Sequence, residues 1–195
     1  SYQTAKLLTY YPDEWITSAL DYSAMEKGKA NGQEDPKSVT LAEARQLGYE
    51  ISKPDINKSE LGYIIDPDKE KKIIPGMGSI KYVGKSAYWE IKNNRPYKTL
   101  ADLFIDKSNN NKWRHSKFNK RALSSLIKLE AFDSLNLVGP NKLFKNYKDM
   151  HDVLIENYDK LKRVSAKKKN NDVMLEISAL LAGHIEDDNN INKED

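Results

Sequence analysis

Residues 76–91, GMGSIKYVGKSAYWEI, place three glycines within nine positions, and a short segment of helical character follows them. Glycine readily adopts backbone conformations that other residues avoid, so glycines at this spacing favour a tight turn. Such a turn can do no more than reverse the chain, or it can hold backbone N–H groups against a phosphate. The charge and sequence around it bear on which of the two applies.

Positive charge is concentrated around this stretch. Residues 69–128 carry 15 basic and 4 acidic side chains, whereas residues 1–68 carry 7 basic and 12 acidic ones. The net charge is therefore +11 in the middle and −5 before it, although that of the whole chain is only +3. Lys and Arg gathered in one region are typical of a surface that binds a polyanion, with a merely solvated basic face as the alternative.

Composition excludes several classes of protein. The chain of 195 residues has no cysteine, so it has no disulfide, no thiolate nucleophile and no Cys-ligated zinc. Its three histidines are scattered. No apolar run is long enough for a membrane helix, and the first residues lack the basic-then-apolar pattern of a signal peptide. We therefore expect a cytoplasmic protein with no membrane partner.

The hydrophobic pattern predicts a mainly α fold with one β-hairpin. Two helices broken at Pro12 are expected near the N-terminus, then a helix from about Val39 to Leu47 ended by Gly48, and a hairpin over residues 62–74. Later helices are expected over residues 85–94, 99–107, 119–132, 141–164 and 172–183, with Thr99 and Asn119 as N-caps. The acidic segment 185–195 has almost no apolar residues and is expected to be disordered.

The only close carboxylate pair in a region of predicted structure is Asp66-Pro67-Asp68. Two carboxylates at this spacing can bridge divalent metals, but Pro-Asp between two strands is ordinary turn chemistry, and no third carboxylate lies nearby. Ser-His-Asp, P-loop, Rossmann and HExxH patterns are absent from the sequence. We therefore predict no catalytic residue and no metal ligand in this chain.

Residues 80–91 fit the helix-hairpin-helix pattern, in which Gly84 ends the hairpin while Ala87 and Ile91 pack the second helix. Backbone N–H groups at the hairpin and at the start of that helix would face a DNA phosphate, and flanking lysines would add attraction without reading bases. One residue fits badly, because Tyr82 stands where a second hairpin glycine is usual and its Cβ disfavours a positive φ. The predicted DNA-contacting residues are Gly78, Lys81, Tyr82, Val83, Gly84, Lys85 and Ser86, together with Lys117, Lys120 and Arg121 in a second basic segment.

Several blocks in one order resemble the bacterial DNA polymerase III alpha family, the C-family replicative polymerases. SYQTAKLLTYYPDEW at the start is similar to the family's Ser-Tyr-Gln-Thr helix and Tyr-Pro-x-Glu-Phe turn, and ARQLGYEISKPDINKSELGYII is similar to the end of its fingers. GMGSIKYVGKSAYWEI resembles the family's Gly-x-Gly-Ala-Ile-Lys-Gly-Val-Gly hairpin, departing at Ser79 and Tyr82. RPYKTLADLF and FNKRALSSLIKLEAFDSL resemble the segments that follow, with Glu130 where the family has Gly. The resemblance covers roughly residues 1–150.

This resemblance implies a segment of a polymerase. It implies that residues 1–72 form the C-terminal part of the fingers, residues 73–140 a tandem helix-hairpin-helix region and residues 141–184 C-terminal helices. In the family, the magnesium-binding aspartates belong to a palm upstream of the matched blocks, so no cofactor is expected in this chain. The expected partners are the backbone of duplex DNA and the polymerase chain that carries the palm and the nucleotide site. The alternative is a stand-alone, non-catalytic DNA-binding or interaction protein derived from this region.

Overall fold

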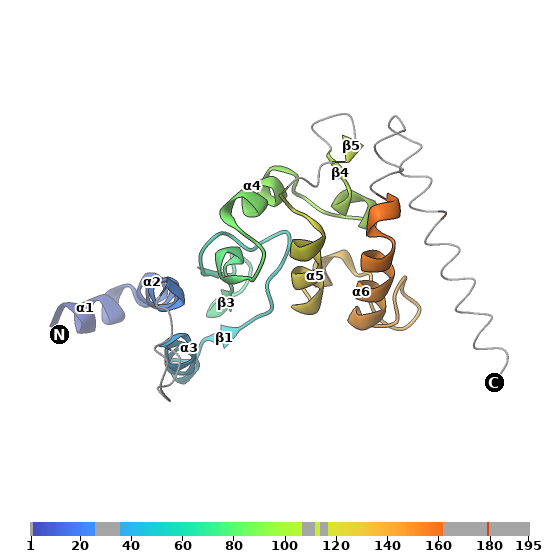
Figure 1. Cartoon of the computed structure of the whole chain (residues 1–195). Helices are drawn as coiled ribbons and strands as arrows, with labels where there is room; N and C mark the ends of the chain where they lie inside the picture. Colours follow the sequence, from blue (N-terminus) through green and yellow to red (C-terminus); the bar gives the residue numbers. More distant parts are fainter. Residues whose placement is uncertain (1, 26–35, 107–111, 114–116, 162–178, 180–195) are drawn as a thin grey trace, which may run out of the picture.

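A computed structural model describes residues 2–25, 36–106, 112–113, 117–161 and 179 (Figure 1). The helices are α1 (Tyr2–Tyr10), α2 (Pro12–Met25), α3 (Pro36–Gln46), α4 (Lys85–Asn93), α5 (Lys120–Lys128) and α6 (Tyr147–Glu156). The strands are β1 (Glu50–Ile51), β2 (Ile64–Ile65), β3 (Lys72–Ile74), β4 (Ile105–Asp106) and β5 (Lys112–Trp113), and short 3-10 helices span η1 (Met77–Ser79), η2 (Leu100–Leu103) and η3 (Asp133–Leu135). The fold is mainly α, as the sequence predicted. Nearly all of the predicted helix 172–183 and the whole acidic segment 185–195 lie outside the described residues.

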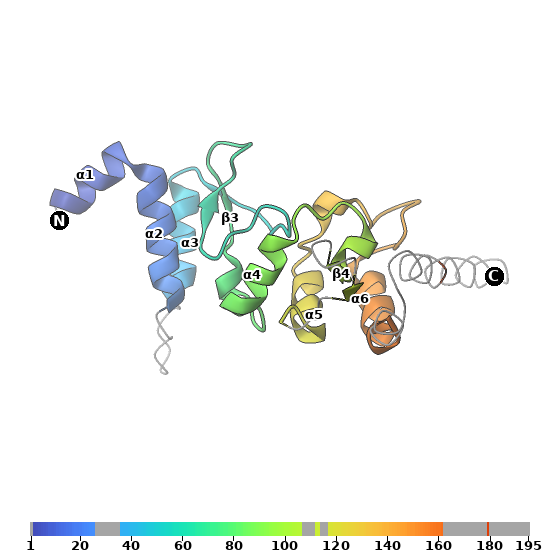
Figure 2. The same cartoon turned by 90° about the horizontal axis from the view of Figure 1, so that it is seen from above.

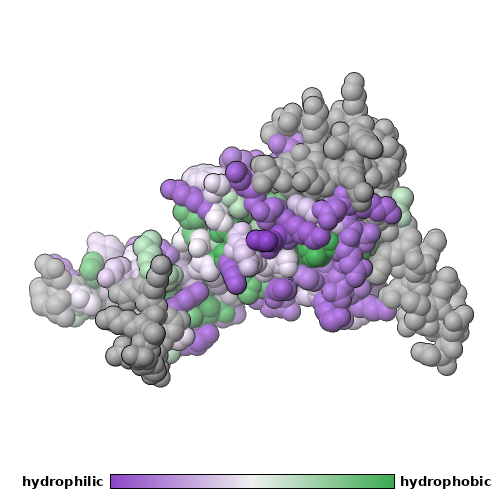
Figure 3. All heavy atoms as spheres, in the orientation of Figure 1, coloured by the Kyte–Doolittle hydropathy of each residue, from purple (hydrophilic) through white to green (hydrophobic). Residues whose placement is uncertain are grey.

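The described elements follow one another along an elongated molecule, with α1 towards one end and α6 towards the other (Figures 1 and 2). Hydrophilic residues cover much of the face drawn in Figure 3 over α5 and α6, with small hydrophobic patches between them. Within the described residues, no helix is both long and apolar enough to cross a membrane.

The first core joins α2, α3 and a small sheet. Its buried side chains are Ile16, Leu20, Ala44, Tyr49, Tyr63 and Ile73. The sheet has the order β1-β3-β2, with β1 parallel and β2 antiparallel to β3. The predicted hairpin is therefore confirmed as β2 and β3. The added strand β1 was not predicted, because two residues are too few to show an alternating pattern.

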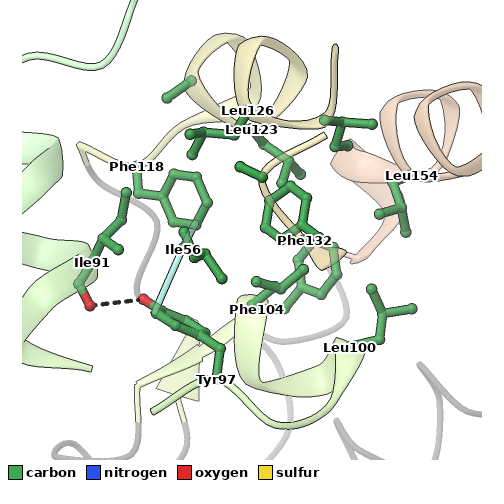
Figure 4. Packing of buried hydrophobic residues seen from close by; sticks show 14 of the residues in the cluster. Ile56, Ile91, Tyr97, Leu100, Phe104, Phe118, Leu123, Leu126, Phe132 and Leu154 are labelled. Carbon is green, nitrogen blue, oxygen red and sulfur yellow. Dashed lines mark hydrogen bonds between the residues drawn. The ribbon is translucent and has the colours of Figure 1, made fainter. Parts of the chain in front are cut away.

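The second core runs from Ile56 to the segment after α6, and Figure 4 shows its centre. The fully buried rings of Phe104, Phe118 and Phe132 meet there between η2, α5 and η3. The phenol of Tyr97 is buried with them and donates to the carbonyl of Ile91 (3.1 Å), so its polar group is satisfied inside this core. This core holds α4 and α5 in fixed positions relative to each other.

Three predicted helices are shorter than expected. The helix predicted over residues 119–132 ends at Lys128, and Glu130 two residues later has a left-handed backbone (φ +59°). Residues 99–106 form only the single turn η2, which Thr99 and Asp102 cap, and then β4, which pairs with the more distant β5. Residues 141–146 are not helical, because Asn146 caps α6 by accepting from the amide of Asp149 (2.9 Å) and the helix begins there. The N-caps predicted at Thr99 and Asn119 are both confirmed.

Candidate nucleic-acid interface

Two of the three glycines in the stretch 76–84 serve the fold itself. The amide of Gly78 donates to the carbonyl of Leu61 (2.9 Å). A Cβ added at Gly76 would lie 2.6 Å from that same oxygen and 2.6 Å from the carbonyl carbon of Gly62. Both positions therefore need glycine for close backbone packing. Gly78 was predicted to contact DNA; its N–H group is used inside the protein, but the residue is exposed, so this contact stays a prediction.

The hairpin turn spans residues 80–83. The amide of Val83 donates to the carbonyl of Ile80 (3.1 Å), and both of these side chains are buried. Lys81 and Tyr82 lie exposed between them, and Tyr82 has φ +67°. Tyr82 thus adopts the left-handed conformation that a glycine would adopt at this position of a turn. The usual backbone of the hairpin is kept, and the aromatic ring projects from its tip.

Gly84 precedes α4 and has a different role from the other two glycines. Its backbone is extended (φ −78°, ψ 173°), a conformation open to any residue, and a Cβ here would meet nothing within 4 Å. No side chain caps the amides at the start of α4, where Lys85 and Ser86 are exposed. Ala87 and Ile91 are buried as predicted. The space in front of the helix start is therefore open, and Gly84 keeps it so.

The second basic segment is anchored beside this hairpin. The carboxylate of Glu90 in α4 accepts from the amides of Lys117 (2.8 Å) and Phe118 (3.1 Å). Asn119 then caps α5 by accepting from the amide of Ala122 (3.1 Å). These bonds fix where α5 begins relative to α4.

The predicted basic residues of α5 point to different places. The guanidinium of Arg121 lies 5.7 Å from the ring centre of Tyr82, and the ammonium of Lys81 lies 5.1 Å from the same centre. Lys120, its neighbour in sequence, forms an ion pair with Asp159 (3.3 Å). The structure therefore brings together Lys81, Tyr82 and Arg121, whereas Lys120 lies beside the segment that follows α6.

A groove of about 610 Å³ next to Lys81 contains basic residues that sequence reasoning missed. Its walls include Lys128 and Ser125 from α5 and Lys37 from α3. Lys128 follows Arg121 by seven residues, which is two helical turns, so both lie on one face of α5. That spacing could have identified Lys128, whereas Lys37 is brought close only by the tertiary fold.

The carboxylate pair Asp66 and Asp68 forms a turn, as its sequence favoured. The buried carboxylate of Asp66 accepts from the amide of Asp68 (2.9 Å) and from the ammonium of Lys58 (3.1 Å). These two bonds hold the pKa of Asp66 below its usual value. In the part of the chain that the structure describes, no group of three or more acidic or histidine side chains is arranged to hold a metal. The carboxylates among the described residues are therefore not arranged as a two-metal centre.

A tight hairpin at residues 80–83, followed by α4 with its uncapped start, is the arrangement of a helix-hairpin-helix protein. Residues 48–142 match the family described as helix-hairpin-helix motif. The chain belongs to the DNA polymerase III alpha family, of which it carries a segment that includes this motif.

The similarity to named relatives is consistent over the same part of the chain. The DNA polymerase III subunit alpha of Pseudomonas aeruginosa is 35% identical over 140 residues, which is 69% of this chain and 11% of that protein. The subunit of Aquifex aeolicus is 35% identical over 138 residues (68% and 10%), and that of Campylobacter jejuni is 30% identical over 154 residues (77% and 12%). The chain thus spans about a tenth of the length of the curated relatives it matches.

Proposed function

We propose that this chain is the part of a DNA polymerase III alpha-type enzyme that grips duplex DNA through its backbone phosphates. A phosphate would lie in front of Gly84, where the uncapped amides at the start of α4 point and no side chain obstructs it. Lys81, Lys85 and Arg121 would add Coulomb attraction from around this point. Contacts of this kind position the duplex and carry no base information.

The observation that carries the proposal is the match to the helix-hairpin-helix family together with the open site at Gly84. The fold does not require glycine at this position, and a side chain there would project into the space that a phosphate would occupy. Lys81, Lys85 and Arg121 have no carboxylate partner among the described residues, so their charge is available to a polyanion.

Residues 1–72 would complete the fingers of the polymerase, and the partner would be the part of the enzyme that carries the palm and the nucleotide site. Catalytic magnesium would be bound in that palm, because the carboxylates described above do not fit such a centre. On this proposal the segment supplies grip and positioning, and the nucleotidyl-transfer chemistry takes place outside it.

The test measures duplex binding by the double variant Lys81→Glu, Lys85→Glu. Fluorescence anisotropy gives the affinity at each of a range of salt concentrations. The variant should bind duplexes of unrelated sequence more weakly by a similar factor. Its log–log salt dependence should also become shallower by about two, since each neutralised phosphate contributes a slope of roughly −0.9.

A charge-matched control is Lys6→Glu, Lys148→Glu, because both lysines are exposed and lie in α1 and α6, towards the two ends of the molecule (Figure 1). The control should retain most of the affinity. Equal losses in the two double variants, or an unchanged salt slope in the first with its circular dichroism intact, would contradict the proposal.

A further inference from the structure

The groove beside the hairpin is lined by several basic residues. It is formed by α3, the segment around β1, the hairpin and α5, and its lining residues are Lys37, Leu41, Ile51, Ser52, Lys53, Pro54, Tyr63, Pro75, Ser79, Ile80, Lys81, Ser125, Lys128 and Leu129. Four of these residues are lysines and none is acidic. A groove lined by one sign of charge raises the local concentration of ligands of the opposite sign. The charge of the groove therefore favours an anionic ligand.

Most of this positive charge is not neutralised by the protein. Lys53 is ion-paired with Glu130 and, at 3.4 Å, with Asp133. By contrast, the ammonium groups of Lys37 and Lys81 lie over aromatic rings. Among the described residues, neither of these lysines has an acidic partner, and Lys128 has none either. Three of the four lysines thus remain available to a ligand.

Much of the lining of the groove is apolar. Leu41, Ile51, Pro54, Ile80 and Leu129 contribute to it, and the side chain of Leu129 is 44% exposed. A duplex presents phosphates on its outside and keeps its bases stacked inside, so it would leave these apolar side chains without contacts. An unpaired strand presents both phosphates and exposed base faces, and grooves that bind such strands combine positive charge with stacking surfaces.

Tyr82 supplies a stacking surface next to this groove. Its side chain is 52% exposed, although the left-handed backbone that presents it is unfavourable for any residue with a Cβ. Lys81 connects the two features, because it lines the groove and also lies over the Tyr82 ring. Arg121 also lies near this ring, with its guanidinium 5.7 Å from the ring centre.

We propose that the groove binds an unpaired strand of nucleic acid, with a base stacked on Tyr82 and the phosphates passing between Lys81, Lys128 and Lys37. The proposal rests on the duplex grip proposed above and extends it. The same hairpin would hold paired DNA at Gly84 and an unpaired extension of that DNA in the groove. The site would therefore favour a duplex with a single-stranded tail over a blunt one.

The experiment compares a blunt duplex with the same duplex carrying an oligo(dT) tail, both measured by fluorescence anisotropy. The wild-type chain should bind the tailed duplex more tightly. Tyr82→Ala should reduce this advantage by about 5-fold or more, because stacking on one aromatic side chain contributes roughly 1–3 kcal/mol per base. Tyr82→Phe should keep the advantage, since a phenyl ring also stacks. Lys128→Glu should reduce it, whereas Lys148→Glu should not.

Tyr82→Gly separates the ring from the backbone. Glycine favours the left-handed conformation of this position, so a hairpin that matters only through its backbone would bind every probe at least as well. We expect this variant instead to lose the tail advantage and to keep its affinity for the blunt duplex.

Three results would overturn the inference while leaving the duplex grip intact. The first is equal affinity of the wild-type chain for the two probes, and the second is an equal loss of affinity for both probes in Tyr82→Ala. The third is full displacement of the tail by an oligoglutamate peptide that binds the wild-type chain and Tyr82→Ala equally well, because the groove would then respond to negative charge alone. Failure of the wild-type chain to bind even the blunt duplex would instead reject the proposed function.

Discussion

The three glycines of the stretch 76–84 occupy positions with different physical requirements. Gly76 and Gly78 are needed because the backbone of Leu61 and Gly62 approaches too closely for a Cβ. Gly84 has ordinary dihedral angles and open space in front of it, so the fold itself does not require glycine there. Positive φ is not the reason at any of the three, because in this hairpin it occurs at Tyr82.

Gly84→Asp should stabilise the fold and weaken DNA binding. An aspartate at this N-cap would accept from the uncapped amides and complement the helix dipole, which together contribute about 0.5–1 kcal/mol. The same carboxylate would repel a phosphate and occupy its place. The thermal midpoint should therefore rise while the duplex affinity falls, which can be checked by calorimetry and anisotropy on one preparation.

Gly76→Ala is the matched control for this prediction. Its Cβ would lie against a carbonyl oxygen that belongs to rigid backbone, and overpacking of this kind costs about 1–3 kcal/mol. We expect a lower thermal midpoint from this variant. If the thermal midpoint rises in both variants, or falls in both, the two glycines do not differ in the way described.

Among the elements, the loop between β1 and β2 joins the two cores. The side-chain amide of Asn57 donates to the carbonyl of Tyr97 (2.9 Å) and accepts from its amide (2.7 Å). Arg95 donates from its Nε to the carbonyl of Ile56 (2.8 Å). These bonds connect residues about forty positions apart, and they place the loop against the segment after α4. They also explain why Ile56 packs in the second core although β1 and β3 belong to the first.

The hairpin β2–β3 gives a pH-dependent prediction through Asp66. Because its hydrogen bonds to the Asp68 amide and to Lys58 favour the ionised form, the pKa of Asp66 is lower when folded than its unfolded value of about 3.9. This contribution to stability is complete above that pH and is lost as the pH falls through the folded pKa. Asp66→Asn should therefore be less stable at neutral pH, on the order of 1–3 kcal/mol, and the deficit should shrink below about pH 4.

Asp68→Asn is the matched comparison in the same turn, since the Asp68 carboxylate is 75% exposed and its ion pair with Lys58 is accessible to solvent. Exposed pairs contribute little, so this variant should lose less. Denaturant titrations at several pH values measure both variants. A deficit in Asp66→Asn that stays constant at acidic pH would contradict the assignment.

How far the sequence alone could predict these elements depended on whether the deciding contacts are local. The N-caps at Thr99 and Asn119 and the β2–β3 hairpin were predictable, because capping and turn residues act over a few positions. Strand β1 and the early end of the helical run after Thr99 were not, since both depend on packing with distant segments. The same limit applies to the site: Lys120 and Arg121 are adjacent in sequence, and only the fold directs one to Asp159 and the other to Tyr82.

For the whole molecule, the arrangement of the two basic segments matters more than the total charge. The net charge of +3 would suggest weak attraction to DNA, yet the +11 segment places Lys81, Lys85 and Arg121 around one hairpin. The fixed packing of α4 against the start of α5, through Glu90 and the amides of Lys117 and Phe118, holds this arrangement. Cations held together in this way can act on one DNA segment simultaneously, which an even scatter of the same charges could not do.

This arrangement predicts different outcomes for two identical charge reversals at neighbouring positions of α5. Arg121→Glu places a carboxylate beside Tyr82 and next to the proposed phosphate site, so it should weaken duplex binding. The log–log salt slope should become shallower by about 0.9 or more, which is the contribution of one phosphate contact. Lys120→Glu changes the net charge equally but breaks only a solvent-exposed pair with Asp159, which contributes about 0–1 kcal/mol to stability. Anisotropy titrations of both variants against one duplex, over a salt series, make the comparison. Similar losses of affinity would mean that DNA responds to the total charge of the basic segments and not to the surface built around the hairpin.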